Sequence, residues 1–272
     1  EKSFNAIFKK KRKKKSVKTT GRQAEFEQAW DTEIKANGWL HVAPDDDLVF
    51  GPELGTKWER AIAKLGLANY FAGAAMMPYG AFLAAAQETR HDLELLAARF
   101  GASIEQVAHR LSTLQRPGAK GVPFFFVRVD QAGTITKRHS ATRLQFARFG
   151  GACPLWNVHR AFETPGRFLR QLAETPDGVR YISIARDISK SGGRYGAPVR
   201  RYAMSLGCEV EHAGQLVYAD GLDLGQEAVF EPIGISCRIC ERTHCHQRAI
   251  PPLEQKLHIQ PDSRKVLPYE IE

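Results

Sequence analysis

Three of the chain's five cysteines, Cys237, Cys240 and Cys245, fall within the short stretch "CRICERTHC". The C-x-x-C spacing of the first two places both sulfurs within reach of one metal centre, and Cys245 follows on the same loop. Three thiolates this close together would repel one another unless a cation shared them. The stretch therefore predicts a metal site that still needs a fourth ligand.

Four other residues could complete this site. Cys153 lies in "GGACPLW", where the glycines let the backbone approach closely and the following proline stiffens the ligand. A Cys-Pro pair also occurs in bacterial ferredoxin cluster motifs. Cys208, in "SLGCEVEH", could equally be a small core residue. We favour Cys153, and the remaining candidates are Cys208, His244 and His246.

The ligand types leave the identity of the metal open between two main choices. Four cysteines, or three cysteines with one histidine, suit a tetrahedral zinc ion. A zinc ribbon usually carries a second C-x-x-C, which this sequence lacks. Three clustered cysteines with one distant cysteine favour an iron-sulfur cluster, with zinc as the alternative and a metal-free loop as the third reading.

The first half of the chain must supply helices. Helical periodicity begins at Trp58, stops at Pro78 and resumes in "YGAFLAAAQE", "DLELLAARF" and "SIEQVAHRLSTLQ". Gly101 ends one helix, and Ser103 with Gln106 predicts a capping box at the start of the next. This last pair has the length of a helix-turn-helix, but its second helix is a poor reader of DNA, so we expect two packed core helices.

The period then changes to that of strands. "FFFVRVD" and "TITKRHS" flank a three-residue hairpin loop that ends in Gly133. Further strands are expected in "VRYISIARDIS", "QLVYADGLDL" and "AVFEPIGISC", and helices in "WNVHRAFETPGRFLRQLAE" and "APVRRYAMSLG". The pattern predicts an α+β domain of about 150 residues, on the scale of a typical domain.

Composition limits the class of protein and the cellular compartment in which it can act. The 272 residues are 43% hydrophobic, enough for a real core. The net charge of +9 lies in residues 1–22, which include "KKKRKKK", and the rest of the chain is neutral. This run cannot fold alone and could touch phosphates without sequence preference. No signal peptide or membrane span is evident, so we expect a cytoplasmic protein whose clustered thiols bind metal.

Several stretches resemble one bacterial family. "LANYFAGAAMMPYGAFLAAA" and "DLELLAARFGASIEQVAHRLSTLQ" resemble the last helices of an ImmA/IrrE-type domain, which has a zinc-metallopeptidase-like fold. "ACPLWNVHRAF", "LGCEVEHAGQLVYADGLDL" and "ISCRICERTHCHQRAIPPL" resemble the C-terminal domain of the short-chain fatty acyl transcriptional regulators. The resemblance, over about residues 64–265, implies a sensor of acyl-CoA that carries a four-iron, four-sulfur cluster and controls propionate, methylcitrate or acetate metabolism.

The chain also departs from that family. The H-E-x-x-H motif of an ImmA/IrrE peptidase is missing, and Leu65 stands where a further acid is expected, so we expect no zinc proteolysis. Residues 1–58 do not resemble the family's DNA-binding domain. We therefore expect a tail and linker, a helical remnant of the metallopeptidase-like domain, a mixed α+β sensing domain and a short C-terminal tail, at 1–58, 59–117, 118–265 and 266–272.

The implied effector suggests where cations should lie. Coenzyme A has phosphates that need cations or free backbone N-H groups, and an adenine that stacks. The stretch "IARDISKSGGRYGAPVRR" offers these in Arg186, Lys190, Gly192, Gly193, Arg194 and Tyr195. Trp156 and His159 would line the acyl pocket near the cluster. The reserve phosphate site is Lys137, Arg138, Arg143 and Arg148.

The resemblance also bears on the oligomeric state, the partners and the activity of the protein. By analogy with regulators that bind two-fold operators, we expect a homodimer. DNA is a partner in the full-length family architecture. The alternative functions are a metal-dependent hydrolase or redox enzyme acting on a CoA thioester and a zinc-stabilised binding module. His159 and Asp220 are the residues that catalysis could recruit, although a single histidine is more often structural.

Overall fold

The computed structural model describes residues 68, 70–146, 151–259, 262, 267 and 269–271. The chain divides into two compact units, residues 1–84 and 85–272, which are described separately. The lysine-rich run, the expected linker and Arg148 lie outside the described residues. In the first unit, residues 70–76 are helical, and α4 (Tyr79–Glu88) begins directly after Pro78 and continues into the second unit.

The helix ends follow the predicted capping signals. In α5 (Leu93–Phe100) the Asp92 side chain accepts hydrogen bonds from two backbone N-H groups, and Gly101 ends the helix with a left-handed φ of 62°. In α6 (Ile104–Ser112) Ser103 and Gln106 form the expected capping box. Both helices, the helix end at Gly101 and the Ser103–Gln106 capping box are confirmed, whereas the Asp92 cap was not predicted.

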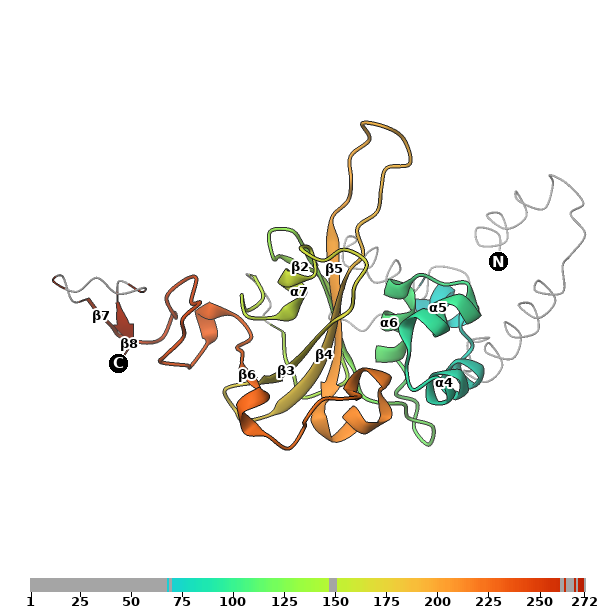
Figure 1. The fold of residues 1–272 in the computed structure, drawn as a ribbon, viewed down its shortest axis with the longest axis horizontal. Coiled ribbons are helices and arrows are strands. Elements are labelled where there is room, and N and C mark those ends of the chain that lie inside the picture. The colour runs from blue at the N-terminus through green and yellow to red at the C-terminus, as the bar shows by residue number, and fades with distance from the viewer. Residues whose placement is uncertain are drawn as a thin grey trace, which may run out of the picture. The chain divides into compact units, whose positions relative to one another are not determined.

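The centre of the second unit is a six-stranded sheet (Figure 1). Its order is β2-β1-β5-β4-β3-β6, and all neighbouring strands are antiparallel except β3 and β6. Gly133, with a φ of 80°, lies in the turn between β1 and β2 as predicted. The bounds are β1 Phe125–Asp130, β2 Ile135–Ser140, β3 Leu169–Glu174, β4 Arg180–Asp187, β5 Tyr202–Glu209 and β6 Glu231–Pro232. A small ribbon pairs β7 (Leu257–His258) with β8 (Glu270–Ile271).

Four element predictions were wrong in type or length. The two predicted helices contribute strands β3 and β5, and only α7 (Asn157–Arg160) is helical within the first. The strand predicted at residues 215–224 is wrong in type, because this stretch contains the end of the 3-10 helix η2 (Val210–Gln215) and all of η3 (Val217–Ala219). Of the last predicted strand, residues 228–237, only the two residues of β6 form a strand. The overall α+β class is confirmed.

Helices cover both faces of this sheet. His109 of α6 contacts the Phe126 ring at 5.5 Å, whereas Trp156, just before α7, contacts the Phe125 ring at 6.5 Å. Because neighbouring strand residues point to opposite faces, α6 and α7 lie on opposite sides. The α6 residues Val107, Ala108 and Leu111 are buried. The predicted packed pair of core helices is therefore confirmed.

Candidate metal centre

The four predicted cysteine ligands line one pocket. Cys153 lies just before α7, and the others lie on the segment after β6, with Cys237 beginning the 3-10 helix η5 (Cys237–Ile239). Two chain segments far apart in sequence thus contribute cysteines to the same pocket. The pocket is lined by Cys153, Pro154, Leu155, Pro232, Gly234, Ser236, Cys237, Cys240, Arg242, Cys245 and Arg248.

Two backbone groups of the irregular segment that follows β6 hold Cys153 in place. Its N-H donates to the Ile235 carbonyl at 3.1 Å, and its Sγ accepts the Gly234 N-H at 3.3 Å. Burial raises the pKa of the Cys153 thiol, and the hydrogen bonds from the backbone N-H groups of Gly234 and Leu155 oppose that rise. Charge on Cys237 and Cys240 raises it further, so a cation in this pocket would favour the thiolate.

Gly234 leaves the space in which the Cys240 sulfur lies. A Cβ on Gly234 would stand 2.8 Å from the Cys240 Sγ, closer than real contacts allow. The Cys237 Sγ accepts the Ala249 N-H at 3.5 Å. Backbone N-H groups directed at sulfur are among the features that tune iron-sulfur clusters.

Two arginines line the same pocket and were missed by the sequence reasoning. Arg242 is held by the carbonyl oxygens of Ile233 and Glu174, at 3.0 and 2.7 Å. Arg248 is only 5% exposed and donates to the carbonyl oxygens of Cys237 and Arg242, yet its Nε has no partner among the described residues. A buried guanidinium with an unused donor suits a negatively charged group bound by thiolates.

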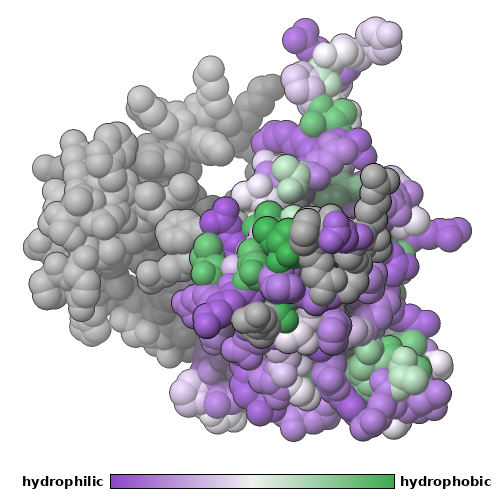
Figure 2. All heavy atoms as spheres, turned by 90° about the vertical axis from the view of Figure 1, so that its left-hand side faces the viewer, coloured by the Kyte–Doolittle hydropathy of each residue, from purple (hydrophilic) through white to green (hydrophobic). Residues whose placement is uncertain are grey.

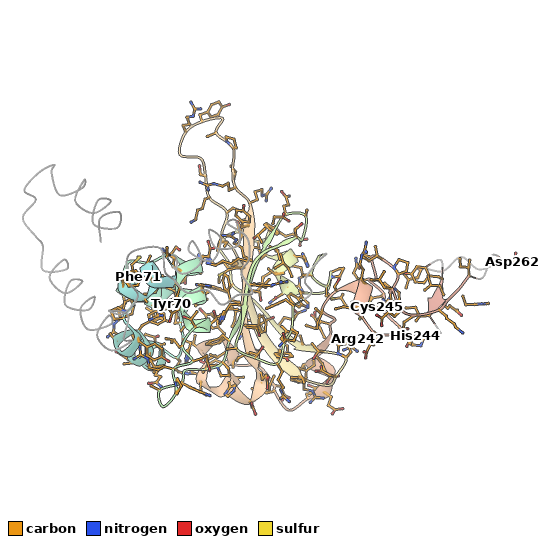
Figure 3. The ribbon with its side chains drawn as sticks, turned by 180° about the vertical axis from the view of Figure 1, so that it is seen from behind. Tyr70, Phe71, Arg242, His244, Cys245 and Asp262 are labelled. Carbon is orange, nitrogen blue, oxygen red and sulfur yellow. The ribbon has the colours of Figure 1, made fainter. Side chains whose placement is uncertain are left out.

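The cysteine segment extends from the edge of the sheet, as the labels of Arg242, His244 and Cys245 show in Figure 3. His244 and His246 are exposed. Cys208 is fully buried in β5 opposite Ile182 and does not line the pocket. Burial raises its thiol pKa strongly. Of the candidate fourth ligands, Cys153 is the one that lines the pocket.

All five cysteines are free thiols. Within the part of the chain that the structure describes, no three His, Cys, Asp or Glu side chains lie close enough together to hold a single metal ion. A cluster of several irons spaces its ligand sulfurs farther apart than one ion does.

Trp156 and His159 lie beside the cysteine pocket. The Trp156 Nε1-H donates to the Gly234 carbonyl at 2.8 Å. The His159 Nε2 is 3.1 Å from the Cys153 carbonyl oxygen, and burial lowers the pKa of this imidazole. Asp220 pairs with Arg90 at 2.7 Å, so the described contacts do not join it to His159.

The structure does not bring the predicted phosphate-binding residues to these two side chains. Arg186 pairs with Glu94 of α5 at 2.6 Å and lies over the Phe168 ring. The following residues form a hairpin that projects beyond β4 and β5 (Figure 1). Gly192 is packed against Ala197 in this hairpin. The exposed hairpin residues include Lys190, Gly192, Gly193, Arg194 and Tyr195.

The reserve cluster is largely engaged elsewhere. Arg143 forms a two-pronged ion pair with Glu209, with contacts of 3.1 and 2.7 Å. Lys137 lies over the Phe126 ring on the opposite face from Trp156. Among the described helices, none is long and apolar enough to cross a membrane.

Known proteins resemble the chain over most of its length. Residues 113–269 match the family model described as the short-chain fatty acyl coenzyme A regulator, C-terminal, and residues 51–112 match an IrrE N-terminal-like domain. A solved Mycobacterium tuberculosis transcriptional regulator is 42% identical and covers 93% of this chain and 76% of its own, with a TM-score of 0.77.

Two curated relatives are similar at the sequence level. A propionyl-CoA carboxylase regulator of Cereibacter sphaeroides is 79% identical over 78% of this chain and 46% of its own length. The HTH-type transcriptional regulator RamB of Mycobacterium tuberculosis is 47% identical over 83% of this chain and 48% of its own. The chain thus spans about half the length of these relatives.

Proposed function

Because the chain belongs to the family of short-chain fatty acyl coenzyme A regulators, we propose that it is the ligand-sensing part of a transcriptional regulator of short-chain fatty acid metabolism. The match over residues 113–269 carries this proposal. Its effector is a short-chain acyl-CoA, and its partner in the longer architecture is DNA. We expect it to act in the cytoplasm and to catalyse no reaction.

We propose a four-iron, four-sulfur cluster held by Cys153, Cys237, Cys240 and Cys245. Three features of the pocket support this fit: the sulfur ligand set, the missing side chain at Gly234, and the unused donor of buried Arg248. When bound, such a cluster supplies structural cross-links and a redox-active charge. The chain's own contribution is to direct backbone N-H groups at two sulfurs and to place positive charge beside them.

The phosphates of coenzyme A remain assigned to the hairpin. Among the described residues, Lys190 and Arg194 have no ion pair, and the exposed Tyr195 ring offers a stacking face. An exposed cationic hairpin suits the long polar end of the effector better than a buried pocket does. Arg186 is already paired with Glu94, so we expect it to support the fold more than the ligand.

We propose that two chains associate. The segment around the cysteines exposes large hydrophobic side chains, and Figure 2 looks onto this side of the molecule. Two-fold pairing is the common arrangement of regulators that read two-fold operators. Light scattering at micromolar concentration should give twice the mass of the chain, and a monomer mass would remove this proposal. The exposed residues are Ile239, Ile250, Leu253, Leu257 and Ile259.

Calorimetry and chemical analysis of the ligand test the proposed function together. Propionyl-CoA should bind the purified chain more tightly than coenzyme A does, raise its melting temperature, and be recovered unchanged after incubation. Hydrolysis of the thioester during incubation would favour the enzyme alternative. Equal binding of acylated and free coenzyme A would contradict acyl-CoA sensing.

A further inference from the structure

The hairpin of residues 188–201 extends beyond the sheet between β4 and β5 (Figure 1). Two backbone hydrogen bonds between Lys190 and Arg200, of 2.9 and 3.1 Å, close its base. At its tip the Arg194 carbonyl accepts the backbone N-H three residues further on at 3.1 Å. Gly196, with a φ of 73°, lies at the position of this turn that favours glycine. The hairpin is therefore held in shape at both ends by backbone hydrogen bonds.

The charged residues of this hairpin are all basic. Residues 188–201 contain no Asp or Glu, and their four cations are exposed. None of these cations forms an ion pair with a residue in the described part of the chain. The hairpin therefore presents a concentrated positive charge that the neighbouring side chains do not neutralise. The four cations are Lys190, Arg194, Arg200 and Arg201.

Two of the four cations lie opposite each other. Lys190 and Arg200 are antiparallel bridge partners, so their side chains leave the same face of the hairpin. The Cβ atoms of directly opposite residues are about 5 Å apart, and like charges in this position are destabilising. The pair therefore does not stabilise the fold. A negatively charged partner bound along this face would remove the repulsion.

The apolar side chains of the hairpin help to define that partner. Tyr195 at the tip is fully exposed, and Val199 is 56% exposed. Attachment to a membrane surface requires a larger apolar area than these two side chains offer. A hydroxyl and a flat ring beside Arg194 suit the sugars and phosphates of a nucleic acid, which tyrosine and arginine commonly contact.

The shape of a two-stranded hairpin favours duplex DNA over duplex RNA. Its two chain segments lie about 5 Å apart, and the major groove of DNA, about 12 Å wide, admits such a ribbon. The major groove of duplex RNA is too narrow for it. Duplex DNA also carries one negative charge for about every 1.7 Å of its length, which suits a concentrated group of cations.

We propose that the hairpin of residues 188–201 contacts the phosphate backbone of duplex DNA through its four cations. Contacts with phosphates carry no sequence information, so the hairpin adds affinity to DNA binding and no specificity. This inference rests on the proposed function, in which DNA is a partner and the phosphates of coenzyme A bind the same hairpin. Because one cation cannot serve both groups fully, coenzyme A should displace the hairpin from DNA.

Fluorescence anisotropy of a labelled duplex of mixed sequence, titrated with the full chain at several salt concentrations, tests the DNA contact. A variant that carries Lys190→Gln, Arg194→Gln, Arg200→Gln and Arg201→Gln should bind at least about tenfold more weakly at about 50 mM salt. The slope of log affinity against log salt should become less steep by about 0.9 for each phosphate contact that is lost.

A second variant controls for net charge. Lys120→Gln, Arg160→Gln, Arg167→Gln and Lys256→Gln remove the same charge from exposed positions elsewhere, and this variant should bind DNA like the wild type. The lysine-rich run is unchanged in both variants, so it does not contribute to their difference. The hairpin variant should melt at or above the wild-type temperature, because a repulsive pair has been removed.

Three outcomes would overturn the DNA contact. The hairpin variant and the charge control could show the same affinity and the same salt slope. Duplex RNA of the same sequence could compete as well as DNA does, which would contradict the choice of DNA. The hairpin variant could lose binding to phosphatidylserine vesicles and keep its DNA affinity, which would assign the hairpin to a membrane surface.

A competition experiment tests the shared use of the hairpin. At constant ionic strength, saturating coenzyme A should lower the DNA affinity of the wild type to that of the hairpin variant and leave the variant unchanged. If coenzyme A binds and the wild-type DNA affinity does not fall, the shared use is wrong. If calorimetry detects no coenzyme A binding while the hairpin variant still loses DNA, the proposed effector site fails and the DNA contact stands.

Discussion

The indole Nε1-H of Trp156 donates a 2.8 Å hydrogen bond to the carbonyl oxygen of Gly234. Gly234 in turn donates its N-H to the Cys153 sulfur and leaves room for the Cys240 sulfur. One buried aromatic side chain thus braces the peptide unit that shapes the cysteine pocket.

Gly234→Ala should reduce the iron bound per chain without changing any thiol. The added Cβ would stand 2.8 Å from the Cys240 sulfur and displace it. Gly214→Ala is the matched control, because a Cβ there meets nothing within 4 Å. Iron analysis of both variants measures the effect. Normal iron in Gly234→Ala would show that the Cys240 sulfur does not need this position.

Single Cys→Ala changes at Cys153, Cys237, Cys240 and Cys245 should each remove the visible absorption of the metal site. Each should also lower the melting temperature, because metal binding stabilises the folded state. Cys208→Ala should keep the absorption, since Cys208 is buried in β5 away from the pocket. The fourth-ligand assignment is wrong if Cys208→Ala loses the absorption and Cys153→Ala keeps it.

Arg194→Ala should weaken coenzyme A binding by about 1 to 3 kcal/mol, the scale of a lost charge-assisted contact. Arg186→Ala, eight residues earlier, should instead lower the free energy of unfolding by about 1 kcal/mol, because its partner Glu94 is largely exposed and its ring contact is modest. Calorimetry and urea unfolding measure the two effects. Unchanged coenzyme A affinity in Arg194→Ala would remove the hairpin from the binding site.

His109→Phe should make the protein less sensitive to acid. Burial lowers the pKa of His109 from 6.5 to about 4. Below about pH 6.5 the imidazole of the unfolded chain binds a proton, whereas that of the folded chain binds one only near pH 4. The free energy of unfolding therefore decreases as the pH is lowered from about 6.5 to about 4. One histidine changes the free energy of unfolding by at most about 1.4 kcal/mol per pH unit.

Urea unfolding at several pH values between 7 and 4 measures the contribution of His109 to the pH dependence of the free energy of unfolding. The phenylalanine ring can keep the contact with Phe126, and the curve of the variant should be flatter than that of the wild type. His258→Phe, at an exposed position, is the control and should follow the wild type. Parallel curves for His109→Phe and the wild type would contradict the assignment.

The cysteines that line the pocket could be predicted from the sequence, whereas the other residues around them could not. A cysteine is recognised as a candidate metal ligand by its residue type and spacing, so Cys237, Cys240 and Cys245 are evident in the sequence. Cys153 is chosen as the fourth candidate because of its neighbouring glycines and proline. Gly234 and Arg248 act through tertiary contacts with chain segments that pattern alone cannot pair. No local signal separates Arg248 from the many other arginines of the chain.

The same reasoning explains which elements could be predicted. Asp92 and Gly101 cap the two ends of α5, and the Ser103–Gln106 capping box fixes the start of α6, so local signals set these helix ends. Strand β5 is covered by α6 on one face and α7 on the other, and its residues Ala203–Glu209 are all buried. A strand buried on both faces shows no alternation, and its Ala, Met and Leu residues favour helix. Its type was therefore set by the sheet and not by its own sequence.

The content of the cysteine pocket is the central claim, and metal and sulfide analysis of anaerobically purified protein tests it most directly. Three measurements should be made on one sample: inductively coupled plasma analysis for iron and zinc, an acid-labile sulfide assay and a visible absorption spectrum. We predict four iron atoms and four sulfides per chain, with broad visible absorption that dithionite bleaches. One zinc per chain in a colourless protein, or a protein without metal, would contradict the claim.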